Sequence, residues 1–251
     1  MYLAVGVRAE RGEHMGASMI VVGRGFVGRS LHAAMEFPGE PISAEEAAIS
    51  PLIETAHVVV WASGTKAISA CESDPAMAAC RNMRAAAKVA RRAVGTFVYV
   101  STDYVFDGQR GGYAADEAPN PKTAYGVSKV RGEDAVLAAC PTALVVRTAH
   151  VIADGCPWIT WLVERLANGH TVEAWEDRYN TPTPVHALAT GIQAAVDEGR
   201  RGIIHVVGSR RVNRLDLFRT IAAIRGLDPD LVVPGRCDNP LVPIDLSLVM
   251  A

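Results

Sequence analysis

A tyrosine and a lysine four residues apart, Tyr125 and Lys129, are the side chains in this sequence best suited to acid–base chemistry. Two helical residues at this spacing lie on the same face. An ammonium beside a phenol favours the phenolate, so it lowers the tyrosine pKa from its usual value of about 10. Two hydroxyl residues, Ser101 and Thr102, directly follow the apolar run 97–100. Together these groups predict a proton donor for a developing alkoxide, as the reduction of a carbonyl by a nicotinamide requires.

A glycine-rich turn stands where such chemistry needs a dinucleotide site. It follows the apolar run 19–22 and precedes a helix expected over residues 29–35. Glycines there permit a tight turn and close approach of the backbone to a pyrophosphate, while the helix N-terminus attracts the phosphates. The residues assigned to the dinucleotide are Gly23, Arg24, Gly25, Phe26, Val27 and Gly28.

Five apolar runs alternate with segments rich in Ala, Arg, Lys and Glu. The runs are 19–22, 57–61, 96–100, 143–147 and 203–207, and helices are expected at 74–94 and 128–139. Strands that alternate with helices of this length predict an α/β fold with a parallel sheet covered on both faces. We therefore expect a Rossmann-type doubly wound sheet, with ligands along the edge where the strands end.

The stretch between Gly28 and the second apolar run is too short for a full Rossmann half. Residues 40–43 are the only candidate strand there, and residues 47–56 the only candidate helix. The acidic residue that usually follows the glycines by about 20 residues and binds the adenosine ribose has no clear counterpart, because Glu45 and Glu46 lie past the end of the candidate strand. Arg24 and Ser43 are instead candidates to accept a 2′-phosphate. This favours NADPH as cofactor, with NADH as the alternative.

Length and composition indicate one domain with a small second lobe. We expect residues 1–18 to be an N-terminal tail and 19–251 a single NAD(P)-binding domain, whose substrate lobe comes mainly from about 150–185 and 208–251. A net charge of -2 and a pI near 6.4 argue against a nucleic-acid partner. No apolar run approaches the ~18 residues of a membrane span. The five cysteines lack metal-ligand spacing, which predicts free thiols in the cytoplasm and no metal site.

The segments around the Tyr–Lys pair resemble the extended short-chain dehydrogenase/reductase family. Residues 101–108 read Ser-Thr-Asp-Tyr-Val-Phe-Asp-Gly, and residues 125–133 read Tyr-Gly-Val-Ser-Lys-Val-Arg-Gly-Glu. Within that family they are most similar to the subfamily of dTDP-4-dehydrorhamnose reductases and their sugar-nucleotide-binding relatives. The resemblance covers roughly residues 19–251 and is specific near 101–133.

The resemblance implies a catalytic set of Thr102, Tyr125 and Lys129. Tyr125 would donate the proton, Lys129 would hold the nicotinamide ribose and lower the tyrosine pKa, and Thr102 would bind the substrate oxygen. Because neighbours on a strand point to opposite faces, only one of Ser101 and Thr102 can point into the site, and the resemblance favours Thr102.

Further positions follow from the same resemblance. Beside the dinucleotide it places Asn82 and the loop Ala62, Ser63 and Gly64, although that loop can also be a simple turn and Asn82 a packing residue. On the substrate side it places Thr65, Thr102, Asp103, His150, Arg178 and Thr183. His150 replaces an aromatic residue of the family pattern, so the pocket is expected to be altered, and this histidine either binds substrate or is structural. Arg178 either binds a diphosphate or forms a surface salt bridge.

The predicted function is NAD(P)H-dependent reduction of a keto group on a nucleotide-linked deoxysugar of the 4-keto-6-deoxyhexose type, or of a similar ketone. The expected partners are a small-molecule substrate and, as a possibility, a second copy in a homodimer. Two alternatives stay open. One is a nucleotide-sugar epimerase or dehydratase of the same fold, for which Asp103 would be an acid–base group next to Thr102. The other is a regulatory subunit that binds dinucleotide without turnover.

Overall fold

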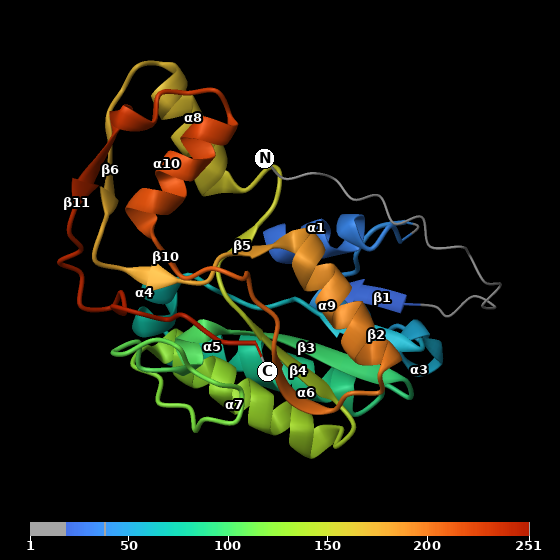
Figure 1. Cartoon of the computed structure of the whole chain (residues 1–251). Coiled ribbons are helices and arrows are strands. Elements are labelled where there is room, and N and C mark those ends of the chain that lie inside the picture. Colours follow the sequence, from blue (N-terminus) through green and yellow to red (C-terminus); the bar gives the residue numbers. More distant parts are fainter. Residues whose placement is uncertain (1–18, 38, 251) are drawn as a thin grey trace.

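The centre of the molecule is a parallel sheet of five strands, in the order β1-β2-β3-β4-β9 (Figure 1). The computed structural model describes residues 19–37 and 39–250, so the predicted tail at 1–18 lies outside the described residues. The strands are β1 (Met19–Val22), β2 (Val58–Trp61), β3 (Thr96–Thr102), β4 (Leu144–Thr148) and β9 (Gly202–His205). Each predicted apolar run forms one of these strands.

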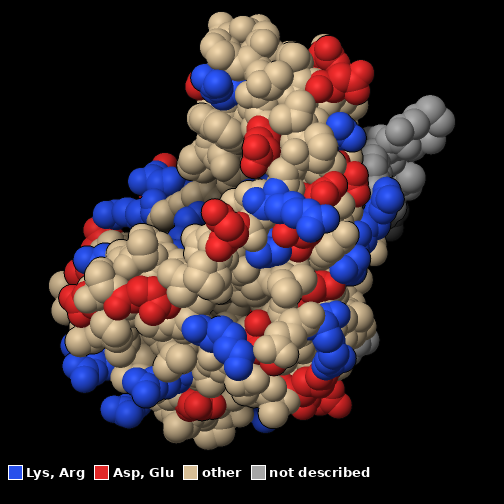
Figure 2. All heavy atoms as spheres, turned by 90° about the vertical axis from the view of Figure 1, so that its left-hand side faces the viewer, with Lys and Arg blue, Asp and Glu red and all other residues tan. Residues whose placement is uncertain are grey.

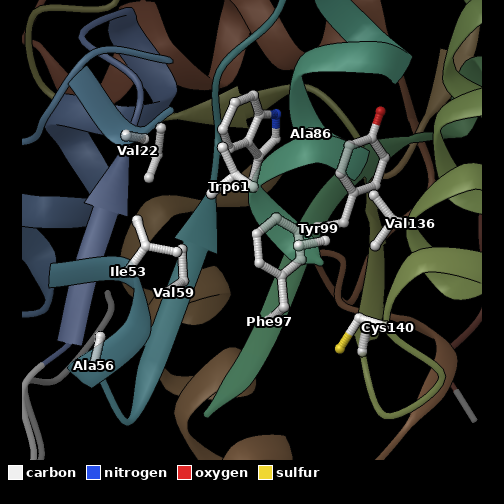
Figure 3. Close-up of a cluster of buried hydrophobic side chains, with 14 of the residues drawn as sticks. Val22, Ile53, Ala56, Val59, Trp61, Ala86, Phe97, Tyr99, Val136 and Cys140 are labelled. Carbon is white, nitrogen blue, oxygen red and sulfur yellow. The ribbon is translucent and has the colours of Figure 1, made fainter. Parts of the chain in front are cut away.

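Helices cover both faces of the sheet, which confirms the predicted fold class. On one face, α1 (Phe26–Ala34) and α9 (Val185–Asp197) pack on Val60 and Val98. On the other face lie α5 (Pro75–Ala79), α6 (Ala85–Ala90) and α7 (Ala124–Ala139). There Trp61, Phe97 and Tyr99 form the centre of a large apolar cluster (Figure 3). Alternate strand residues thus point to opposite faces, as the pleat requires.

The shortened half between β1 and β2 is confirmed, although its two candidate elements differ from the prediction. In place of a strand at 40–43, Ile42 alone pairs with β1, accepting from Gly23 N at 2.8 Å and donating to Val21 O at 3.1 Å. The predicted helix at 47–56 is two short helices, α2 (Ala44–Ala47) and α3 (Leu52–Thr55). A capping box between Ser43 and Glu46 begins the first one early, and Pro51 begins the second.

Helix α7 begins four residues before its predicted start. The Thr123 hydroxyl caps it by accepting from Gly126 N at 3.0 Å, so Tyr125 lies in the first helical turn. On the same face of the sheet, α4 (Ile68–Ser73) follows β2, and a π-helical turn, Cys80–Arg84, joins α5 to α6. The result is that Tyr125 stands near the end of β3.

A second apolar core lies beyond the carboxyl ends of the strands. It contains Leu162, Val172, Phe218 and Val232. Its elements are α8 (Pro157–Ala167), β6 (Val172–Trp175), α10 (Arg214–Ile224), η3 (Pro229–Leu231) and β11 (Val232–Gly235), with β6 and β11 paired in parallel. The short strands β5 (Val151–Ile152), β7 (Tyr179–Asn180), β8 (Thr183–Pro184) and β10 (Val212–Asn213) lie between this lobe and the sheet.

The surface carries both signs of charge side by side. On the face seen in Figure 2, Lys and Arg side chains alternate with Asp and Glu over the lobe and the sheet domain. Within 19–37 and 39–250, no helix has the length and apolarity needed to cross a membrane.

Candidate active site

The glycine turn leaves no room for side chains at two of its positions. Gly23 has a φ of +135°, and a Cβ on Gly28 would stand 1.9 Å from the Gly23 carbonyl oxygen. Helix α1 begins at Phe26; its N-cap residue, Gly25, offers no side-chain cap, and its first turn holds no acidic residue among the residues described. Its first backbone N–H groups therefore point outward without a side-chain partner, which is the arrangement that binds phosphates.

Arg24 and Ser43, the two residues predicted to bind the 2′-phosphate, both form hydrogen bonds or ion pairs with Glu46 at the shortened edge of the sheet. The Arg24 guanidinium lies 2.9 Å from the Glu46 carboxylate and donates to Pro41 O at 3.0 Å. Ser43 accepts from Glu46 N at 3.1 Å. The Arg24–Glu46 pair is about half exposed, so it contributes little to stability and an incoming anion can compete for the arginine.

Asn82 ties the loop after β2 to helix α7. Its amide binds both the N–H and the C=O of Thr65, at 2.8 and 3.0 Å, and donates to the Ser128 hydroxyl at 2.8 Å. A Cβ on Gly64 would come within 2.4 Å of the Asn82 side chain. These bonds satisfy the buried amide within the protein, which favours the packing interpretation of Asn82. The loop Ala62–Thr65 also lies beside the glycine turn, because its first N–H donates to Val22 O at 2.8 Å.

Thr102 and Ser101 point in opposite directions, as the alternation along β3 predicts, and Thr102 is the one on the side of Tyr125. Thr102 Oγ1 donates to Asp103 Oδ1 at 2.9 Å, and the Thr102 side chain lies close enough to Tyr125 to lower the pKa of that phenol. On the opposite face, Ser101 Oγ donates to Glu133 Oε1 at 2.5 Å. The structure therefore brings Thr102 and Tyr125 together at the carboxyl end of the strand.

The expected lowering of the Tyr125 pKa is wrong for this structure. Burial raises the pKa of Tyr125, and the neighbouring Asp103 raises it further, although the Thr102 side chain acts the other way. Lys129 does not counteract this, because its ammonium donates to Val100 O at 2.8 Å and lies 3.9 Å from the centre of the Tyr99 ring. Burial lowers the pKa of Lys129 to about 7.

The carboxyl group of Asp103 is buried, which raises its pKa from 3.8 to about 7. Between these two pH values the unfolded chain has lost the proton and the folded chain retains it, so folding stability falls as the pH rises through this window. We expect Asp103→Asn to remove this loss. The stability difference between Asn variant and parent should grow by roughly 1.4 kcal/mol per pH unit from about pH 4 to pH 7. Urea unfolding at a series of pH values measures it. Parallel stability curves would show that Asp103 ionises normally in the folded state.

A cavity of about 60 Å³ lies next to these residues, between the sheet and the lobe. Of the predicted substrate residues, it brings together Asp103, His150 and Arg178. Thr183 is absent from its lining, because Thr183 is fully buried and bonded to the hydroxyl of Thr148. The other residues lining it are Tyr104, Trp175, Tyr179, Asn180, Arg214, Val242, Pro243 and Leu246.

Arg178 is fully engaged within the protein. Its guanidinium donates to the carbonyls of Val242 at 3.2 Å and Cys237 at 2.5 Å, and lies 2.9 Å from the carboxylate of Asp177. All three side-chain nitrogens thus have protein partners. The arginine holds the segment 237–242 on the lobe, in agreement with the salt-bridge alternative for this residue.

Tyr104 and Arg214 are two of the cavity residues that the sequence analysis did not identify as site residues. The Tyr104 ring packs edge-on against Tyr125, with 5.7 Å between centroids. Arg214 is the first residue of α10, where a cation opposes the helix dipole. This unfavourable position is the one signal in the sequence that could have marked Arg214.

Comparison with known proteins shows which family this chain is similar to. The family described as RmlD substrate binding domain matches residues 25–245. A dTDP-4-dehydrorhamnose reductase of Mycobacterium tuberculosis is 33% identical over 240 residues, which cover 91% of this chain and 77% of the relative. Methionine adenosyltransferase 2 subunit beta of Danio rerio is 31% identical over 189 residues, covering 71% and 58%. A crystal structure of dTDP-4-dehydrorhamnose reductase from Bacillus anthracis in complex with NADP has a TM-score of 0.84 at 20% identity, covering 94% of this chain and 92% of that one. The chain belongs to the family of the RmlD substrate binding domain.

Proposed function

We propose that this protein is an NAD(P)H-dependent reductase that acts on the keto group of a nucleotide-linked deoxysugar of the 4-keto-6-deoxyhexose type. The observation that carries the proposal is the close placement of Thr102 and Tyr125 at the carboxyl end of β3. It lies in a chain whose mycobacterial relative is named dTDP-4-dehydrorhamnose reductase. NADPH is the preferred cofactor, with NADH as the alternative.

The residues of the turn suit a dinucleotide. Gly23 and Gly28 keep the backbone uncovered, and the first turn of α1 offers its N–H groups to the pyrophosphate. The loop Ala62–Gly64 would lie along the dinucleotide, and Arg24 with Ser43 would hold the 2′-phosphate. A bound nicotinamide supplies the hydride for the ketone carbon.

Residues of the chain itself would supply the proton that the reduction requires. The raised pKa of Tyr125 keeps its hydroxyl protonated near neutral pH. An alkoxide that forms beside it is the stronger base and takes this proton. Thr102 would orient the same oxygen, and the buried Lys129 would bind the nicotinamide ribose.

The test measures whether the nicotinamide is consumed. Purified protein with NADPH and a panel of nucleotide-linked 4-keto-6-deoxysugars is expected to oxidise NADPH with at least one of them, one cofactor per product. Deuteride from labelled cofactor should appear on the former carbonyl carbon. Product without net loss of NADPH would indicate an epimerase or dehydratase.

A regulatory subunit is a second candidate, because a methionine adenosyltransferase subunit is 31% identical to this chain. It predicts that the protein binds dinucleotide yet consumes none with any ketone in the panel.

We also propose that the enzyme works in the cytoplasm. All five cysteines are free, as expected in a reducing compartment. A homodimer stays a prediction.

A further inference from the structure

Lys129 is a buried ammonium without a carboxylate of its own. The residue is 5% exposed, and its Nζ donates to Val100 O at 2.8 Å. In the part of the chain that the structure describes, it forms no ion pair with an acidic side chain. Glu133 favours the charged form of this lysine, but its carboxylate already bonds Arg147 at 2.8 Å and Ser101 at 2.5 Å. Burial acts against the charge, so the contacts that compensate for it decide whether the ammonium persists.

The ring of Tyr99 is the second contact of this ammonium. Nζ lies 3.9 Å from the ring centre, which is a cation–π distance, and such contacts are strongest where water is excluded. Tyr99 is fully buried in the apolar cluster of Figure 3. Burial raises the pKa of its phenol, so the ring meets Lys129 as a neutral π system and not as a phenolate.

Two further contacts hold the Tyr99 ring in place. Its hydroxyl donates to Asn82 O at 2.6 Å, and Asn82 belongs to the π-helical turn Cys80–Arg84. Single π-helical turns inside helices are rare and frequent at functional sites. On α7, a Cβ at Gly132 would stand 2.3 Å from the phenol oxygen. The glycine therefore lets α7 approach the ring closely, which brings Lys129 over its face.

We propose that Tyr99 is a positioning residue for Lys129, whose ring keeps the buried ammonium charged and holds it beside Val100 at the end of β3. An ammonium has three N–H donors. Val100 accepts one of them, and the ring requires no lone pair, so donors remain for the hydroxyl groups of a nicotinamide ribose. Only this last step, the ribose contact, rests on the function proposed above.

Few other groups around the lysine can titrate. Those on the elements that surround Lys129 and its neighbour Tyr125 are Glu133 on α7, Arg147 on β4, Asp103 after β3 and Cys71 on α4. Glu133 and Arg147 form a buried pair, and burial raises the pKa of both Tyr125 and Cys71. Asp103, with a pKa of about 7, is the one group expected to titrate together with the lysine.

Nuclear magnetic resonance of isotope-labelled lysine in the dinucleotide-free protein tests the proposal. The chain has four lysines, and the other three, Lys66, Lys88 and Lys122, are exposed and serve as internal references. Tyr99→Leu is expected to lower the pKa of Lys129 by about one unit, the size of a desolvated cation–π contact. Tyr99→Phe loses the hydroxyl but keeps the ring, so it should leave this pKa nearly unchanged. An unaltered pKa in Tyr99→Leu, or an equal decrease in both variants, would overturn the role of the ring.

A measurement on the parent protein decides the matter even if a variant fails to fold. The ring current of a tyrosine that faces the ammonium moves the ε-methylene protons of Lys129 upfield of those of the three exposed lysines. Lys129 protons without this displacement would show that the ring does not face the ammonium in solution, and the proposal would fail.

Calorimetry with NADP⁺ separates this proposal from the proposed function. If charged Lys129 binds the ribose, the ratio of the NADP⁺ Kd of Tyr99→Leu to that of the parent should rise from about one near pH 5 to about tenfold near pH 8, because a pKa lower by one unit leaves a tenth as much charged lysine. The 2′-phosphate and Asp103 are common to both proteins, so their titration cancels in the ratio. A constant ratio together with a lowered Lys129 pKa would support the role of Tyr99 and contradict the ribose contact.

Discussion

Tyr125→Phe is expected to lower the rate of ketone reduction by roughly 10²–10⁴-fold, the usual contribution of a positioned general acid. The substitution removes only the hydroxyl, which lies beside Thr102. The ring that packs on Tyr104 at 5.7 Å remains, so the cavity keeps its shape. Dinucleotide affinity should stay nearly unchanged. Single-turnover oxidation of NADPH, followed by nicotinamide absorbance, measures the chemical step apart from product release.

Tyr113→Phe is the matched control for this experiment. That phenol bonds Asp107 at 2.5 Å and lies outside the candidate site, so its loss should leave the rate of reduction unchanged. Retention of most activity by Tyr125→Phe would show that another group delivers the proton. Asp103 is then the next candidate, because it bonds Thr102 and has a pKa of about 7.

Arg147→Met is expected to destabilise the fold by about 3–5 kcal/mol, because it leaves a buried carboxylate without its partner. Arg147 and Glu133 are both about 1% exposed, and their closest side-chain atoms are 2.8 Å apart. Ser101 donates to the same carboxylate, so the network joins β3, β4 and α7 directly behind the candidate site. The midpoint of denaturant unfolding measures the loss.

The double variant Arg147→Met/Glu133→Leu should recover part of this stability, since it removes the uncompensated charge. As a control, Arg29→Met breaks an exposed pair with Glu40 at 3.4 Å and should cost less than about 1 kcal/mol. A small effect of Arg147→Met would mean that Glu133 takes up a proton or reaches water in the variant.

The sheet and its order along the chain were predictable, because each strand is a compact run of β-branched or aromatic residues. The opposite directions of Ser101 and Thr102 also followed from the pleat alone. Helix α7 was harder to delimit. Its buried face carries the polar residues Ser128, Lys129 and Glu133, so the apolar periodicity that marks a helix is missing.

The role of Arg178 could not be read from the sequence. Arg178 is held by carbonyls of residues 237 and 242, about sixty positions further along, and no local pattern indicates such contacts. The direction of the Tyr125 pKa shift could not be predicted from the sequence either. Spacing placed a lysine on the same helix face, but burial and a nearby carboxyl decide the shift, and both depend on the tertiary structure.

The five strands stand side by side in the order in which the ribosome makes them. No strand has to enter between two that are already paired, so the sheet can grow at its open edge as the chain emerges. Thr102, Tyr125 and Lys129 are all synthesised before α8, β6 or α10 of the lobe. The segments that carry Thr102, Tyr125 and Lys129 are therefore complete before the lobe is made, so they can fold before the lobe docks above them.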